Sequence, residues 1–296
     1  MVDPQKEVPI INSYPLYPAG IYLIALTFLL IPGIAAADWF ADLEAGIRYN
    51  DNLPRAQLSR DRKSDTAFLL EGGGGKRFYP TEAGILSLSM ILRAQGLARF
   101  DDINSVAFGG RAIYRHKLGL GASAPWISLA VGGGREDFQG NLRNAAFFDP
   151  AFETGIRFRE RWDLRAGLRY ERRYGANSGV FDQRGTTLSL NAGYEVNEWL
   201  SLSLGGEFRN GDVVSSSPSN SRVLGAASAR VTDPAFGTNV VAYRLEAKTY
   251  TLIVASNVAV TDRFSLDLNY ERQETQANKG IHYLNNVTRF RVLYSF

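Results

Sequence analysis

Hydrophobic and polar residues alternate with a period of two along most of the chain after its first 37 residues. In the segment 162–174, Leu164 and Leu168 fall on one side, whereas Arg165 and Arg169 fall on the other. Successive side chains of a β-strand point to opposite faces, so this pattern predicts strands with one apolar face and one charged face. No segment of similar length keeps the 3.6-residue period of a helix. The chain is therefore expected to be all-β.

The pattern predicts about twelve strands, and their connections alternate in length. The strands are expected at residues 38–50, 65–79, 84–99, 104–118, 125–137, 148–160, 162–175, 184–196, 199–210, 241–260, 263–273 and 286–296. Tight turns fall at 80–83, 160–161, 197–198 and 261–262, and longer loops at 51–64, 138–147, 176–183, 211–240 and 274–285. An even strand number with loops sorted in this way is typical of outer-membrane barrels. We predict a single transmembrane antiparallel up-and-down β-barrel over residues 38–296, with short periplasmic turns and long extracellular loops.

The N-terminal segment carries the longest apolar run of the chain, at residues 21–31. Pro32-Gly33 and then Ala35-Ala36-Ala37 follow it, as in a secretory signal peptide with a small-residue cleavage site. The alternative is an uncleaved membrane anchor, for which the run is short, since a helical span needs about 20 residues. We expect residues 1–37 to be a signal peptide, removed on export through the inner membrane to the cell outer membrane.

Aromatic residues mark the starts of alternate predicted strands. They are Trp39, Trp126, Trp162, Trp199 and Phe264. Tryptophan favours the membrane–water interface because one end of its ring system is apolar and the other is polar. These five residues are expected to form an aromatic girdle at the periplasmic rim.

The last predicted strand carries a pattern that is specific to one class of membrane proteins. Phe290, Val292 and Tyr294 alternate behind a terminal Phe296. In this the sequence resembles the outer-membrane β-barrel superfamily of Gram-negative bacteria, and the end of its first strand at 49–52 is similar to uncharacterised porin-like barrels. The resemblance implies that the barrel-assembly machinery pairs with the C-terminal strand. It also implies that outer-membrane lipid and lipopolysaccharide surround the barrel.

Composition excludes several chemistries. The chain has no cysteine and only two histidines, so thiol catalysis, disulfides and cysteine-based metal sites are impossible. The glycine run 72–75 lacks the spacing of a phosphate-binding loop, and we expect no cofactor and no metal. The net charge of +3 is spread along the strands, which does not favour nucleic-acid binding. Arginine nevertheless makes up 27 of the 33 basic residues, and this bias needs a structural role.

The predicted register turns most of these arginines towards the barrel lumen. The expected basic lining is Arg48, Arg93, Arg111, Arg115, Arg157, Arg165, Arg169, Arg209, Arg244 and Arg263, and the acidic lining is Glu44, Glu71, Glu153, Glu171, Glu195, Glu207, Glu246, Asp267 and Glu271. Two interpretations compete. An open lumen rich in arginine would select small anions. Alternatively, arginine–carboxylate pairs fill the interior, since twelve strands lie between filled small barrels and open porins.

Three functions are compatible with this lining. We expect a porin-like passive channel for small solutes with a mild anion preference. The alternative is a non-conducting barrel that presents long loops to a polysaccharide or to a protein partner, including another copy of itself. A barrel hydrolase is least expected, because His116 and His282 have no recognisable catalytic partners in the sequence, and no catalytic residue is predicted. The loop 211–240 could fold inward as a constriction or lid, but we favour a variable surface loop.

Overall fold

The structure is a computed structural model that describes residues 39–219 and 221–296. The predicted signal peptide at residues 1–37 lies outside these ranges. The strands are β1 (Trp39–Asn50), β2 (Asp65–Thr81), β3 (Gly84–Leu97), β4 (Ser105–Lys117), β5 (Trp126–Phe138), β6 (Ala145–Phe148), β7 (Ala151–Phe158), β8 (Trp162–Gly175), β9 (Gln183–Glu195), β10 (Leu200–Pro218), β11 (Ala229–Thr232), β12 (Val240–Ala259), β13 (Phe264–Ala277) and β14 (Ile281–Ser295). One short helix, α2 (Ser221–Ala226), precedes β11. None of the helices in the described part of the chain is long and apolar enough to cross a membrane.

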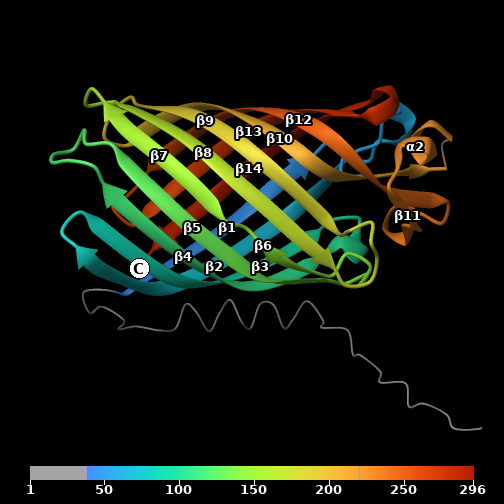
Figure 1. Ribbon diagram of the computed structural model, residues 1–296, viewed down its shortest axis with the longest axis horizontal. Coiled ribbons are helices and arrows are strands. Elements are labelled where there is room, and N and C mark those ends of the chain that lie inside the picture. The colour runs from blue at the N-terminus through green and yellow to red at the C-terminus, as the bar shows by residue number, and fades with distance from the viewer. Residues whose placement is uncertain (1–38, 220) are drawn as a thin grey trace, which may run out of the picture. The chain divides into compact units, whose positions relative to one another are not determined.

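These strands form one closed antiparallel barrel (Figure 1). Apart from the short strands β6, β7 and β11, each strand pairs with its neighbour in sequence, β10 pairs with β12, and β1 pairs with β14 to close the ring. Strands β6 and β7 together occupy one place in the ring, because both pair with β5 and β8 and only residues 149–150 separate them. Strand β11 lies on a loop beside β12. The ring therefore has twelve strands, and the predicted fold is confirmed.

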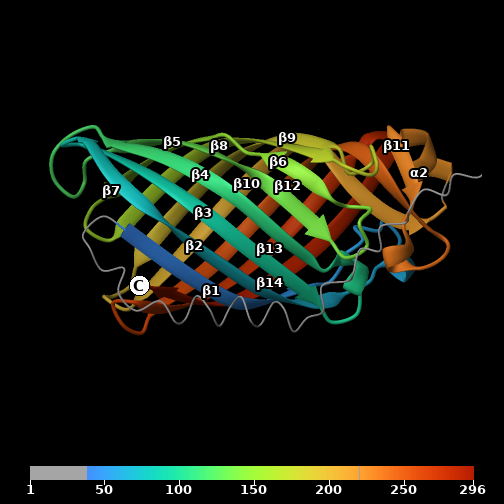
Figure 2. The same ribbon diagram turned by 90° about the horizontal axis from the view of Figure 1, so that it is seen from below.

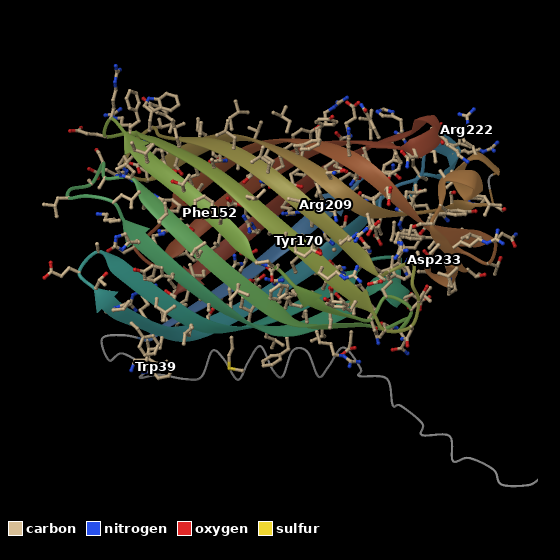
Figure 3. The ribbon with its side chains drawn as sticks, viewed as in Figure 1. Trp39, Phe152, Tyr170, Arg209, Arg222 and Asp233 are labelled. Atoms are coloured by element: carbon tan, nitrogen blue, oxygen red, sulfur yellow. The ribbon has the colours of Figure 1, made fainter. Side chains whose placement is uncertain are left out.

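The outer surface of the barrel is apolar, as a lipid-facing surface must be. Leu190 is 65% exposed, and Leu204 and Leu252 are also exposed on neighbouring strands. Their side chains alternate with those that point inward, so the period-two pattern of the sequence results from lipid on one side and the lumen on the other. Trp39 is labelled in Figure 3 near the end that carries the C-terminus.

The two ends of the barrel differ. The C-terminus and the tight turns lie at one end, which the loop-length rule assigns to the periplasm, while α2 and β11 lie at the opposite end (Figures 1 and 2). This outer end contains the buried core of the molecule. Three apolar clusters centre on Leu245, on Phe236 and on Phe181. The barrel is thus packed with side chains at its extracellular mouth.

The alternation of strand residues reverses at this outer end. On β12, Tyr243 and Leu245 are 1% and 0% exposed and point inward, whereas Glu246 is exposed on the outer face. Here one face of β12 packs on the cluster around Leu245, whereas the other face is exposed at Glu246 and is covered at Ala242, 0% exposed, by Val180 and Phe181 of the β8–β9 loop. The strands that carry the reversed pattern, notably β10 and β14, also extend farther outward than the sequence predicted.

Candidate functional site

The lumen contains a chain of arginine–carboxylate pairs. Arg291 contacts both Asp267, at 2.7 Å, and Glu44, at 3.2 Å. Further inward-facing pairs are Arg93–Glu71, Arg157–Glu195, Arg165–Asp163, Arg173–Glu136 and Arg289–Glu271. The prediction that carboxylates partner the arginines of the lumen therefore describes part of the lining.

Several of these pairs are accessible to water although they point into the barrel. The side chains of Arg93 and Glu71 are 47% and 41% exposed, and those of Arg157 and Glu195 are 42% and 47% exposed. A lumen filled by side chains would bury them. Away from its outer end, the interior of the barrel is therefore wet.

Other arginines of the lumen have no carboxylate within 4 Å in the described part of the chain. Arg48 donates a hydrogen bond to the amide oxygen of Gln95, and Arg209 donates one to the backbone oxygen of Asp212. Arg169 is exposed, and Arg111 is half-buried with an unpartnered Nε atom. Among the described residues, Glu153, Glu171 and Glu207 likewise form no ion pair within 4 Å, although Arg169 is within electrostatic reach of Glu207 and Arg209 of Glu171. The pairing of charges is thus incomplete, and arginine remains in excess among the unpaired groups.

The outer mouth is closed by the connection between β10 and β12, whose described residues 221–239 we call the plug. Its helix α2 sends Val223 into the cluster around Leu245. Its 3-10 turn at Pro234–Phe236 packs Phe236, 5% exposed, against Ile103 and Phe100 of the β3–β4 loop. Strands β12 and β4 are on opposite sides of the twelve-strand ring, so the plug crosses the mouth. The surface-loop interpretation of residues 211–240 is wrong, and inward folding is observed.

A buried ion pair fixes the plug to the loop between β5 and β6. Asp233 in the plug is fully buried, and its Oδ2 atom accepts hydrogen bonds from Arg143 Nη2 and from Ser216 Oγ, each at 2.6 Å. The Arg143 guanidinium lies 4.9 Å from the ring centre of Phe181 and 5.6 Å from that of Phe236. We call this arrangement the latch. Asp233 lies at the outer end of the barrel in Figure 3.

A second loop folds into the mouth from β1. The side chain of Asn52, fully buried, bonds to both backbone groups of Ala56 and to the backbone oxygen of Leu284, which holds the turn in place. The backbone oxygen of Pro54 accepts a hydrogen bond from Ser216 N of β10, at 2.8 Å. The backbone oxygen of Arg55 accepts one from Ser215 Oγ, also at 2.8 Å. We call this connection between β1 and β2, residues 51–64, the inner loop. It narrows the lumen directly beneath the plug.

A cavity of about 390 Å³ lies between the plug, the inner loop and the barrel wall, and we call it the vestibule. Four arginines line it: Arg48 from β1, Arg55 from the inner loop, Arg143 and Arg173. Three phenylalanines, Phe138, Phe181 and Phe236, line it as well. Its volume falls within the range of small-molecule sites in proteins.

Most residues predicted to line the lumen lie on the inward face, but Arg244 and Glu246 do not. Both alternate with Leu245, so they lie on the opposite face of β12 from the cluster beneath α2. On this face Val214, the β10 partner of Arg244, lines the vestibule, and Glu246 is exposed. Arg244 donates to the backbone oxygens of Gly179 and Asp182 there. The prediction failed because it placed the polar residues of β12 inside along its whole length, whereas at the outer end of the strand the apolar Tyr243 and Leu245 take the inward face. Arg263 lies in the exposed turn before β13, at the periplasmic rim.

The predicted aromatic girdle also needs a correction. Trp39, Trp162 and Trp199 are exposed at the rim, and Phe264 shares the outward parity of Leu268. Trp126 instead faces the lumen, one residue out of phase with the exposed Leu129, with the Arg115 guanidinium 4.2 Å from its ring centre. Gly155 makes room for it, because a Cβ atom there would lie 2.5 Å from the indole ring.

Sequence reasoning missed the residues that close the mouth. Arg143 and Asp233 lie 90 positions apart in loops, and no spacing rule brings them together. Glycines within strands are a signal that could have indicated large inward side chains, because a glycine leaves room for such a neighbour. A Cβ atom at Gly185 would lie 2.6 Å from the Arg209 guanidinium.

The two histidines lie outside the lumen. Nδ1 of His116 is 3.3 Å from the hydroxyl of Tyr114, and Nε2 of His282 is 3.1 Å from Glu274 on the outer face. Both contacts are with neighbours on the same or the adjacent strand. Neither arrangement resembles a histidine poised to activate a serine.

The comparisons with known proteins concern the fold of the chain. No family model and no curated protein matches the sequence. Among solved structures, an outer membrane channel from Pseudomonas putida F1 aligns with a TM-score of 0.59 and 11% identity, over 89% of this chain and 97% of that one. The NanC porin and the Salmonella typhi outer membrane phospholipase each align at 0.45 with 10% identity, over 86% of this chain and 98% and 90% of theirs. Likenesses at these identities concern the fold alone, and scores below 0.5 support no argument about function. The chain has the fold of the outer-membrane β-barrels.

Proposed function

We propose that this protein is an outer-membrane channel for small solutes that prefers anions, and that the plug regulates its outer mouth. The observation that carries the proposal is the water-accessible lumen, in which inward ion pairs remain close to half exposed. A barrel that served only as a scaffold would have no need for a wet interior of this kind.

The anion preference rests on the arginines without a close carboxylate. Arg169 is exposed inside the lumen, and Arg48, Arg111 and Arg209 lie on the same inward face with no carboxylate within 4 Å among the described residues. Rings of arginine or lysine favour anions in pores because they lower the electrostatic energy of an entering negative charge.

The test is the reversal potential of the purified barrel in a planar bilayer under a potassium chloride gradient. We expect brief openings with a reversal potential on the chloride side. Arg169→Glu should shift it towards the potassium side. The matched variant Arg272→Glu changes the same charge on the exposed outer end of β13 and should leave it unchanged. A barrel that carries no current at any voltage, or that prefers potassium, would contradict the proposal.

A second candidate is a non-conducting barrel that binds a partner through its outer end. The burial of the plug favours it, since Asp233 and Phe236 are packed as tightly as core residues. In that case neither the wild type nor a barrel without the plug would conduct, and the loss of the plug would abolish binding of the partner.

Targeting and assembly complete the proposal. We propose that residues 1–37 are cleaved during export and that the assembly machinery recognises β14. Phe290, Tyr294 and Phe296 are exposed on the outer face of β14, with Val292 between them on the same face, and the Phe296 ring packs on Tyr294 at 4.8 Å. These side chains are accessible to a protein that adds its own strand to the edge of an unclosed barrel.

A further inference from the structure

The vestibule contains more positive charge than its own carboxylates balance. Of its four arginines, Arg173 is paired with Glu136 at 2.8 Å, and Arg143 is paired with Asp233 at 2.6 Å. Arg48 and Arg55 have no carboxylate within 4 Å in the described part of the chain. Two guanidinium groups of the cavity lining therefore form no direct ion pair with a carboxylate among the described residues.

The surroundings of Arg55 add to this excess. The hydroxyl of Tyr283 is buried and has no hydrogen-bond partner among the described residues. The charged groups that act on it are Arg55 and Arg209, both cations. The Arg48 guanidinium is within electrostatic reach of two cations, Arg289 and Arg55, and of two carboxylates, Glu271 and Glu136, which are themselves paired with Arg289 and Arg173. Like charges gathered in a partly buried space are unfavourable unless an anion joins them.

The vestibule also has an aromatic lining, and the Arg143 guanidinium lies over two of its rings, those of Phe181 and Phe236. Phe138, Phe181 and Phe236 form this lining, and Phe236 belongs to the plug. An inorganic anion has no apolar surface to bury against these rings, whereas an organic anion would bury its apolar body there. Arginine binds carboxylates through two parallel hydrogen bonds, which also fixes the orientation of the ligand.

We propose that the vestibule is a binding site for a small organic carboxylate, whose carboxylate group pairs with Arg48 and Arg55 and whose apolar body rests against the three phenylalanines. This inference rests on the proposed channel function and names the class of solute that the channel would hold before passage. A solute bound there would contact the plug through Phe236.

The test is isothermal titration calorimetry, in which benzoate is added to the purified full-length barrel in detergent. Acetate serves as the probe with the charge but without the body, and benzyl alcohol as the probe with the body but without the charge. We expect benzoate to bind at least tenfold more tightly than either. Equal binding of acetate, equal binding of benzyl alcohol or no binding of benzoate would overturn the proposal.

The variants separate the vestibule from the rest of the lumen. Arg48→Gln and Arg55→Gln should each weaken benzoate binding about tenfold or more, because each removes a charge-assisted hydrogen bond. Arg169→Gln removes the same charge from the lumen outside the vestibule and should bind benzoate as the wild type does. Arg55 lies in a loop, so its variant reports even if Arg48→Gln fails to fold. Unchanged binding in a folded Arg55→Gln barrel would overturn the proposal.

The outcome is distinguishable from failure of the channel function. Anion-selective current without benzoate binding would reject the vestibule site and leave the channel intact. Benzoate binding that depends on Arg55, without any current, would support the site and reject the channel.

Discussion

The latch, which joins the plug to the loop between β5 and β6, predicts a specific effect of Asp233→Asn. The Asp233 carboxylate is fully buried, and its partner Arg143 is only 12% exposed. Replacing the carboxylate by an amide preserves the shape of the side chain and removes its charge. The Arg143 guanidinium then stays buried between Phe181 and Phe236 without a counter-charge.

Removing one partner of a buried ion pair costs about 3–5 kcal/mol. We take about 3 kcal/mol, the lower end of that range, because Asn can still accept the hydrogen bonds from Arg143 and Ser216. Each 1.4 kcal/mol changes an equilibrium about tenfold, so the ratio of released to closed plug should rise about 100-fold. The apolar contacts of Val223 and Phe236 remain, and the plug therefore still spends most of its time closed.

Single-channel recording measures this ratio as the open probability. Asp233→Asn should open far more often than the wild type, with an unchanged single-channel conductance, because the lumen itself is not altered. Asp137→Asn is the matched control. It breaks the Arg135–Asp137 pair, whose side chains are 66% and 53% exposed, and such pairs contribute at most about 1 kcal/mol. If folded Asp233→Asn barrels open no more often than Asp137→Asn barrels, the latch does not hold the plug.

Three further predictions concern stability and assembly. Gly75→Ala should lower the temperature at which the folded band disappears in gel electrophoresis, with a cost of about 1–3 kcal/mol, because its Cβ atom would meet the backbone of Leu88, whereas Gly96→Ala, with open space around it, should not. Leu190→Arg on the lipid face should lower the free energy of unfolding in lipid vesicles by about 2–4 kcal/mol, and Gln276→Arg on the outer end of β13, beyond the lipid, should leave it unchanged. Phe296→Ala should reduce the amount of barrel assembled in cells while refolding of the purified protein stays normal. Equal effects within either variant pair, or full assembly of Phe296→Ala, would count against the respective reasoning.

Strand positions were predictable because the membrane imposes them. Lipid on one side and a polar lumen on the other force the alternation that is visible from Leu164 to Tyr170. The same rule failed for Arg244 and Glu246. At the outer end of β12 the apolar Tyr243 and Leu245 pack inward, so Arg244 and Glu246 take the opposite face, where they meet the β8–β9 loop and water. A reversal from charged-inside to apolar-inside along one strand is thus a signal for the point at which a strand leaves the membrane.

The plug and the vestibule could not be read from the sequence because they depend on contacts across the barrel. Arg143, Asp233 and Phe236 lie in loops without periodicity, and only the closed ring brings them together. The sequence predicted which kinds of residue line the lumen, but it did not predict whether their side chains fill it or leave room for water. Whether Arg93 and Glu71 fill the interior or leave it wet depends on the diameter of the barrel, which strand count alone does not determine.

The claim that a wet, arginine-rich lumen is closed by a packed plug is tested most directly by removing the plug. Pro218 and Val240 are direct partners in the β10–β12 ladder, so a short turn can replace residues 219–239 without disturbing the barrel register. We predict that the folded plug-less barrel carries a steady, chloride-selective current in planar bilayers, whereas the wild type opens only briefly. A folded plug-less barrel that carries no current, or one that prefers potassium, would contradict the claim.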